Sequence, residues 1–186
     1  MRVLGISGSL RRDSHNTKLL RAAGELLEAE GADFVLYDGL REIPPYDEDD
    51  DLEPGPGAVE ALRRAVAEAD AVVFSTPEYN HSIPGQLKNA VDWLSRPIAT
   101  NVLRNKPVIV VGASTGMFGA VWAQAELKKV LGATGARVSH QAEVPVGQAH
   151  TRFDDGGRLT DEQIEEQIRA AVRALVAETQ PTQVAA

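Results

Sequence analysis

The residues whose types and spacing suit chemistry stand in three loops, each of which follows a predicted strand. The first loop is GSLRRDSHNT, residues 8–17, between the apolar run 2–7 and a helical pattern. Hydroxyls and unpaired N–H groups at a helix N-terminus favour an anion, and Arg11 and Arg12 add charged donors. Helix capping alone would explain one polar side chain but not the cluster. The loop therefore predicts a phosphate site, although it matches neither GxxxxGK[ST] nor GxGxxG.

The second loop is TPEYNHSIPG, residues 76–85. Two prolines stiffen it, and its amide, phenol and backbone groups suit an extended segment that lines a flat polar ring. His81 has the chemistry of an acid or a base, but a lone histidine in a loop is more often solvated. The sequence therefore gives His81 no catalytic role.

The third loop is GASTGMFG, residues 112–119, whose glycines let a ligand come close to the backbone. It also spells GxSxG between a predicted strand and a predicted helix, the context of a hydrolase nucleophile elbow. Such hydrolases order their triad as serine, acid, histidine. No aspartate lies between Ser114 and either His140 or His150, and only two glutamates do. The hydrolase interpretation also leaves the first loop unexplained, so the sequence disfavours it.

Alternating strands and helices position these loops. We expect strands at residues 2–7, 33–38, 71–75, 107–112 and 137–144. Helical patterns occupy residues 17–30, 58–69, 84–94 and 120–131, and a final amphipathic helix includes residues 164–176. Continuously apolar strands that alternate with helices predict one three-layer domain with a parallel sheet. Ligands of such sheets lie beyond the carboxyl ends of the strands, where the three loops fall.

Composition narrows the function classes. The 186-residue chain is 43% hydrophobic and 25% charged, and its lack of cysteine excludes disulfides, thiolate metal sites and a cysteine nucleophile. A formal net charge of −8 disfavours nucleic acids and anionic membranes as partners. The N-terminus does not resemble a secretory signal and no run is long enough to span a membrane, so we expect a cytoplasmic protein. The acidic run 47–51 predicts a solvated loop rather than a metal site.

Taken together, the three loops resemble those of the NADPH-dependent FMN reductase family, which includes quinone, azo-dye and chromate reductases. The matching stretches are GSLRRDSHNT (8–17), PEYNHSIPGQLKNAVDWLSRP (77–97), GASTGMFGAVWAQAELKKVL (112–131) and FDDGGRLTD (153–161). The resemblance spans essentially the whole chain. It implies a flavodoxin-like α/β three-layer sandwich with a five-stranded parallel sheet in the order 2-1-3-4-5. Residues 1–178 would form one FMN-binding domain, followed by a frayed tail at 179–186.

The resemblance also implies roles for residues. The first loop would hold the FMN phosphate, the second would contact the isoalloxazine, and the third would approach the flavin. The implied cofactor-binding residues are Ser9, Arg11, Ser14, Asn16, Thr17, Pro77, Glu78, Tyr79, Asn80, Ser114, Thr115, Gly116 and Gly119. No residue is assigned as an essential acid or base, because hydride chemistry belongs to the flavin. No metal is implied.

The activity that the resemblance implies is an FMN-dependent NAD(P)H oxidoreductase that reduces a quinone, free flavin or similar small acceptor. The alternative is a flavodoxin-type electron carrier that serves a protein partner, but such carriers typically lack the two arginines of the first loop. Family members form homodimers or dimers of dimers, which makes Trp93 and its helix interface candidates. Trp122 stands where many relatives carry arginine, which leaves the electron donor and the tetramer open.

Overall fold

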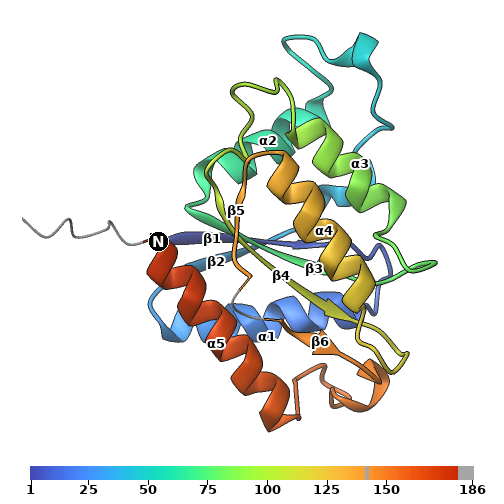
Figure 1. Ribbon diagram of the computed structural model, residues 1–186, viewed down its shortest axis with the longest axis vertical. Coiled ribbons are helices and arrows are strands. Elements are labelled where there is room, and N and C mark those ends of the chain that lie inside the picture. Colours follow the sequence, from blue (N-terminus) through green and yellow to red (C-terminus); the bar gives the residue numbers. More distant parts are fainter. Residues whose placement is uncertain (141–142, 180–186) are drawn as a thin grey trace, which may run out of the picture.

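A parallel β-sheet forms the centre of the protein (Figure 1), whose computed structural model describes residues 1–140 and 143–179. Its main strands are β1 (Arg2–Ser7), β2 (Asp33–Tyr37), β3 (Ala71–Thr76) and β4 (Pro107–Ala113). They lie in the order β2-β1-β3-β4, and every pairing is parallel. The strand order reverses at β1, which places the switch point beside the first loop. The predicted flavodoxin-like order is confirmed.

The fifth position of the sheet differs from the prediction. Instead of one strand over 137–144, two short strands, β5 (Arg137–Val138) and β6 (Pro145–Val146), pair with the same edge of β4. Pro107 pairs with Arg137, whereas Gly112 pairs with Pro145, so the pairing offset grows by three residues along β4. One continuous strand cannot pair with β4 in two registers that differ by three residues. The edge strand is therefore divided into β5 and β6. Residues 141 and 142 of the predicted strand lie outside the described residues.

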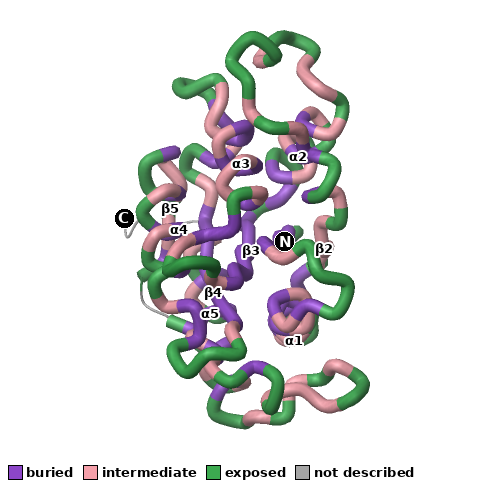
Figure 2. Tube along the Cα trace, turned by 90° about the vertical axis from the view of Figure 1, so that its right-hand side faces the viewer, coloured by how far each residue is buried: buried purple, intermediate pink, exposed green. Residues whose placement is uncertain are grey.

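Helices cover both faces of the sheet (Figure 1). Helices α1 (His15–Ala29) and α5 (Glu162–Thr179) lie on one face, and α2 (Gly57–Glu68), α3 (Gly85–Leu94) and α4 (Val121–Ala133) lie on the other. Side chains alternate along each strand, and Figure 2 shows that both faces of the central strands are buried. In β1, for example, Val3 packs with α1 and α5, whereas Leu4 packs with the other three helices.

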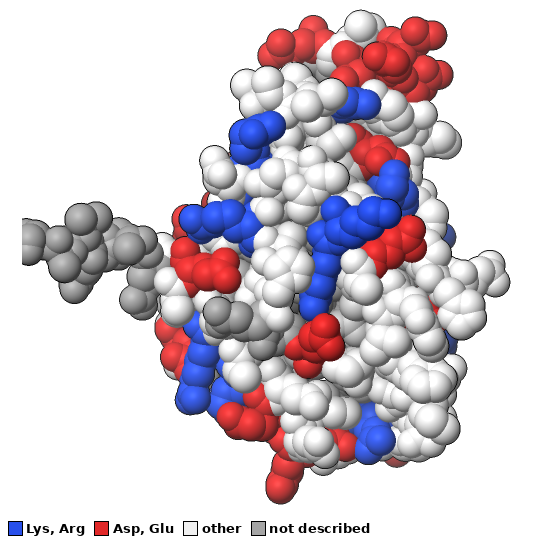
Figure 3. Space-filling view, in the orientation of Figure 1, with Lys and Arg blue, Asp and Glu red and all other residues white. Residues whose placement is uncertain are grey.

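The acidic run forms an exposed loop between β2 and α2, as predicted, and Figure 3 shows its carboxylates at one end of the molecule. Residues Glu48–Asp50 make a single 3₁₀ turn, and Asp51 forms an ion pair with Arg63 at 2.8 Å. Within residues 1–140 and 143–179, no cluster of three or more potential metal-ligating side chains occurs. No helix in the same ranges is long and apolar enough to cross a membrane.

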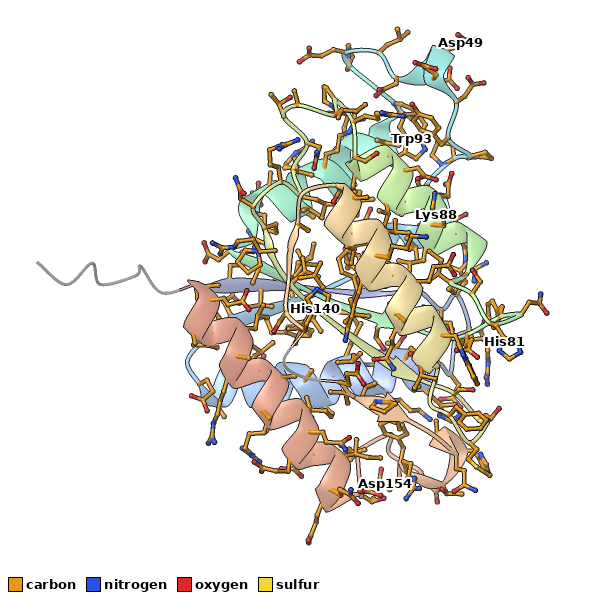
Figure 4. The ribbon with its side chains drawn as sticks, in the orientation of Figure 1. Asp49, His81, Lys88, Trp93, His140 and Asp154 are labelled. Atoms are coloured by element: carbon orange, nitrogen blue, oxygen red, sulfur yellow. The ribbon has the colours of Figure 1, made fainter. Side chains whose placement is uncertain are left out.

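Trp93 is a core residue, which corrects its expected place at a subunit interface. Its side chain is fully buried within the chain, and its indole N–H donates to the carbonyl of Pro44 at 2.9 Å. Tyr46 packs edge-on against it, and Figure 4 shows it among the helices beneath the acidic loop. Helix α5 continues through Thr179, and the remainder of the predicted tail, 180–186, lies outside the described residues.

Candidate functional site

The three loops meet at the carboxyl end of the sheet and enclose a hollow of about 130 Å³, which we call the three-loop pocket. Strands β1, β3 and β4 are neighbours, so the loops that follow them must lie side by side. The lining residues are Ser9, Arg11, Ser14, His15, Asn16, Pro77, Glu78, Tyr79, Ala113, Ser114 and Thr115. Nine of the thirteen residues expected from sequence are among them. Thr17, Asn80, Gly116 and Gly119 are not.

The N-terminus of α1 opens toward this pocket and is capped by its own loop. Ser14 is the N-cap residue, and its buried hydroxyl accepts the N–H groups of Asn16 and Thr17 at 3.2 and 3.3 Å. The first turn of α1 contains no acidic residue. Asp13 precedes the cap, but its carboxylate pairs with Lys18 at 2.6 Å, and this contact lowers the pKa of Asp13. The positive end of the helix dipole therefore remains available to an anion.

Asn16 ties α1 to the ends of two strands. Its side-chain N–H donates to the carbonyl of Ala113 at 2.9 Å, and its oxygen accepts the Ala113 N–H at 2.9 Å and the Ser75 hydroxyl at 2.8 Å. The residue is 3% exposed. Three buried hydrogen bonds to the framework make Asn16 an anchor of the pocket wall rather than a freely available ligand group.

Smaller hydroxyls support the same loop from behind. Thr17 donates to the Ser7 hydroxyl at 3.0 Å, and Ser7 in turn accepts the Ser9 N–H at 3.4 Å. Ser9 Oγ accepts the Arg11 N–H at 3.4 Å. Thr17 thus supports the loop through Ser7 without lining the pocket, whereas Ser9 lines it.

Glu78 contributes a carboxylate to the lining, but that carboxylate is already engaged. One oxygen accepts the backbone N–H groups of Trp122 and Ala123, at 3.1 and 3.2 Å. These are first-turn groups of α4, whose own N-cap residue makes no capping bond. The other oxygen lies 3.5 Å from Nδ1 of His81. The N-terminus of α4 therefore offsets the charge of Glu78.

Tyr79 and Ser82 close a tight turn by exchanging backbone hydrogen bonds of 3.0 and 3.1 Å. Between them, Asn80 and His81 have φ angles of 54° and 60°, in the left-handed region. The turn directs Tyr79 to the pocket and leaves Asn80 outside its lining. Figure 4 shows His81 at the outer edge of the molecule, where it packs edge-on against Trp122 at 4.8 Å.

The third loop is held by its glycines as well as by strand pairing. Gly119 has a φ of 59°, and a Cβ there would lie 2.4 Å from the backbone of Pro145. Gly119 therefore allows the close approach of β6 and does not line the pocket. Ser114 and Thr115 do line it, and Ser114 Oγ accepts the Gly116 N–H at 3.1 Å. No histidine within residues 1–140 and 143–179 hydrogen-bonds to Ser114, which leaves the GxSxG pattern without a triad.

His15 and Ala113 line the pocket although neither was expected from the sequence. His15 packs against Phe153 with ring centroids 6.0 Å apart, and burial, followed by the charge of Lys18, lowers its pKa. Its Nδ1 is buried, with no hydrogen-bond partner among the described residues. His15 stands in the polar loop that the sequence marked as a phosphate site, but residue type alone did not single it out.

A second hollow adjoins the first and shares Arg11 and Tyr79 with it. It has a volume of about 310 Å³ and is completed by Leu10 and by the first residues of α3. The three-loop pocket is small beside pockets for drug-sized ligands, which hold roughly 300–1,000 Å³, and the adjoining hollow lies at the lower end of that range. The site is therefore suited to bind one end of an elongated molecule and to leave the other end accessible to solvent.

Comparison with known proteins agrees with this arrangement. Residues 1–151 match the family model described as NADPH-dependent FMN reductase. An NAD(P)H-dependent FMN reductase of Pseudomonas aeruginosa is 41% identical, with 94% of this chain and 93% of that protein covered. A 2-hydroxy-1,4-benzoquinone reductase of Burkholderia is 36% identical, with 87% of each covered.

Among solved structures, the flavoenzyme NAD(P)H:(acceptor) oxidoreductase FerB of Paracoccus denitrificans aligns with a TM-score of 0.86 and 36% identity. The alignment covers 96% of each chain. The family predicted from the three loops is thereby confirmed, together with FMN as cofactor, a reduced nicotinamide as donor and oxidoreductase activity. The chain belongs to the NADPH-dependent FMN reductase family.

Proposed function

We propose that this protein holds FMN at the three-loop pocket and uses it to pass electrons from NAD(P)H to a small quinone. The observation that carries the proposal is the set of donors around the α1 N-terminus, in a protein of formal net charge −8. An acidic protein gains nothing from a cluster of anion-binding groups unless an anion binds there. The phosphate of FMN supplies that anion.

The phosphate end fits the first loop. Arg11 would supply charged donors, Ser9 and Ser14 would supply hydroxyls, and the α1 N-terminus would supply a favourable dipole. His15 lines the same pocket, and its unpartnered Nδ1 is buried behind the lining. Asn16 and Thr17 would act by keeping these groups in place, because their side chains are bound to the framework.

The ring end fits the surface made by the second and third loops. Pro77, Tyr79 and Thr115 would contact the ring, and Glu78 would set the position of the second loop through α4. Asn80 and Gly116 lie next to lining residues and would act through the backbone path of these loops, whereas Gly119 would act by allowing the close approach of β6. The open hollow beside Tyr79 would leave the ring accessible to a second flat molecule.

Bound FMN supplies the redox chemistry, accepting two electrons and a proton as hydride from the nicotinamide and giving them up to the acceptor. The protein's own part is to bind, orient and exclude water. A buried, hydrogen-bonded wall at Asn16, Ser75 and Ala113 keeps water from one side of the pocket. One open face serves donor and acceptor in turn, so we expect ping-pong kinetics.

A quinone is the acceptor class that the relatives favour. The Burkholderia relative is named for a hydroxylated benzoquinone, and other relatives, including one of Escherichia coli, are named quinone reductases. A single-ring quinone is flat and apolar enough to stack beside Tyr79, which is 50% exposed. Free flavin is a larger acceptor of the same shape.

We also propose that the working form is a homodimer or a dimer of dimers. Large apolar side chains are exposed close to the pocket, including Met117, Phe118 and Trp122. Contiguous exposed apolar groups beside a functional site commonly mark an interaction surface. Sedimentation velocity of the FMN-loaded protein measures the assembly, and a monomer at micromolar concentration would contradict it.

The deciding experiment is a visible spectrum of the FMN-reconstituted protein before and after anaerobic addition of NADPH or NADH. We expect bound flavin to bleach and to regain its colour when benzoquinone is added. Bound flavin that stays oxidised with both nucleotides would favour an electron carrier that serves a protein partner. Failure to bind FMN would overturn the proposed site.

A further inference from the structure

The tip of the first loop is tied to a segment that lies outside the three-loop pocket. Nη2 of Arg41 donates to the carbonyl of Leu10 at 2.6 Å. Within the described chain, this is the one hydrogen bond that joins residues 10–12 to a segment outside the first loop. Arg41 itself is absent from the linings of the three-loop pocket and of the adjoining hollow. It therefore contacts the loop rather than the space that a ligand would fill.

The carbonyl that Arg41 binds belongs to the peptide unit directly before Arg11. In a planar trans peptide, the C=O of Leu10 and the N–H of Arg11 point in opposite directions. That N–H donates to Ser9 Oγ at 3.4 Å, and both Ser9 and Arg11 line the three-loop pocket. By fixing the direction of the carbonyl, Arg41 fixes the peptide plane from which the Arg11 side chain departs.

Arg41 stands on a segment that is packed into the core. It lies in η1 (Gly39–Glu42), a 3₁₀ turn between β2 and α2. The side-chain N–H groups of Gln86, in the first turn of α3, donate to the carbonyls of Leu40 and Ile43 at 2.8 and 2.9 Å. The side chains of Leu40 and Ile43 are both buried. The bond from Arg41 therefore connects the loop tip to a part of the chain whose own position is well determined.

The acidic residues of its own turn do not account for the orientation of Arg41. Asp38 precedes η1 and Glu42 ends it, yet neither forms an ion pair with Arg41 in the part of the chain that the structure describes. The exposed guanidinium donates to the first loop instead. A hydrogen bond from a charged donor is stronger than one between neutral groups, which suits it to hold a loop.

We propose that Arg41 is a positioning residue for the phosphate of FMN. It holds the Leu10–Arg11 peptide in the orientation that directs Arg11 to the phosphate, and it does not touch FMN itself. This inference rests on the proposed function, which places the phosphate at the first loop.

The test is titration of the FMN-free protein with FMN and with riboflavin, followed by flavin fluorescence. Riboflavin lacks the phosphate, so the ratio of the two affinities isolates the phosphate contacts. Arg41→Met should weaken FMN binding by about fivefold or more and leave riboflavin binding unchanged. Because Arg41 is exposed, the unfolding free energy should stay nearly the same.

Two further variants separate the hydrogen bond from the charge. Arg41→Lys keeps a charged donor and should restore most of the FMN affinity. Arg12→Ala is the matched control, because it removes an equal charge from the loop tip but leaves the Arg41 bond in place, and it should bind FMN as the wild type does.

A double-mutant cycle tests whether Arg41 acts through Arg11. In an Arg11→Ala background, Arg41→Met should weaken FMN binding by about twofold or less, because the side chain that Arg41 directs is already gone. An equal loss in both backgrounds would mean that Arg41 acts on the phosphate by its own charge, and this would overturn the proposal.

Unchanged FMN affinity in Arg41→Met, or equal losses for FMN and riboflavin, would also overturn it, while the proposed FMN site would stand. A wild type that binds FMN no more tightly than riboflavin would instead contradict the phosphate site of the proposed function, and the positioning role would fall with it.

Discussion

Helices α1 and α4 both begin beside the three-loop pocket, but their first turns are satisfied in different ways. In α1, a neutral hydroxyl from Ser14 caps the helix, and Asn16 anchors the first turn to the strands. In α4, the N-cap residue Ala120 has a φ of 62° and contributes no capping bond, so the carboxylate of Glu78 takes two N–H groups instead. One helix is capped without charge, and the other is capped with a full negative charge.

This difference decides where a phosphate can bind. An anion at a helix N-terminus gains from the dipole only if no other anion already occupies that end. Glu78 fills this role for α4, whereas the acid nearest to α1, Asp13, is paired with Lys18. Of the two helices, α1 is therefore the one that presents an available positive end to the pocket.

The largest effect is expected for Asn16→Ala, which removes the anchor of α1. Three buried hydrogen bonds would be lost, so we expect the FMN-free protein to lose about 3 kcal/mol of unfolding free energy. Asn16→Asp would place a buried carboxylate oxygen against the Ala113 carbonyl and should lose at least as much stability as the alanine variant. Urea unfolding measures both variants. A loss below about 1 kcal/mol for the alanine variant would show that the anchor is not structural.

Glu78→Ala should remove the carboxylate that caps α4 and so make the N-terminus of α4 available to an anion. We expect a stability loss of about 1–2 kcal/mol, typical of a lost cap, because the Trp122 and Ala123 N–H groups lose their acceptor. The emptied N-terminus of α4 should then accept an anion, so inorganic phosphate should raise the melting temperature more in the variant than in the wild type. His81→Ala is the control, since it leaves the cap in place. Equal phosphate responses would refute the role given to Glu78.

Arg11→Ala tests the open end of α1 directly. Arg11 lines the pocket and is exposed, so its loss should weaken FMN binding by about tenfold or more and change the unfolding free energy by under about 0.5 kcal/mol. Turnover by protein that retains FMN should change less than FMN affinity does. Arg12→Ala, whose side chain is absent from the pocket lining, should bind FMN normally. Unchanged FMN affinity in Arg11→Ala would move the phosphate elsewhere.

The sequence predicted the strand order and the helices of the fold, because their signals are local. Apolar runs and helical periodicity lie within each element, and the predicted strands at 2–7 and 107–112 match β1 exactly and β4 to within one residue. The divided edge strand was missed, because the three-residue change of register depends on how β5 and β6 meet β4. The burial of Trp93 was missed for a similar reason, since its partner Pro44 lies 49 residues away.

The candidate site was predictable as three loops but not as individual roles. Residue type indicated that Asn16, Glu78 and Gly119 belong near the pocket. It did not indicate that Asn16 anchors two strands, that Glu78 caps a helix 44 residues later, or that Gly119 makes room for β6. Such roles depend on which backbone groups come within hydrogen-bond distance after folding. His15 was visible as a member of the first loop, but its burial beside the pocket was not.

The smallest expected effect concerns this histidine and the pH dependence of the α1 end. Burial lowers the pKa of His15 below its ordinary value of 6.5, so the unfolded chain takes up a proton before the folded one does. His15 therefore favours the folded state above pH 6.5, and this contribution is lost as the pH falls through the lowered pKa. His15→Gln removes the titration. The unfolding free energy of the FMN-free wild type should therefore fall relative to that of the variant as the pH is lowered from above to below 6.5. Urea unfolding at pH values on both sides of 6.5 measures this difference.

Bound FMN should reduce or reverse that difference, because a phosphate near the His15 ring favours the protonated imidazole and raises its pKa. FMN affinity of the wild type should then increase as the pH falls below 6.5, until the phosphate itself is neutralised, whereas His15→Gln should show a weaker dependence. The comparison of binding curves for the two proteins isolates His15 from the other titrating groups, which both proteins share. Parallel pH profiles for the two proteins would place the phosphate away from His15 and leave Arg11, Ser9 and Ser14 to hold it.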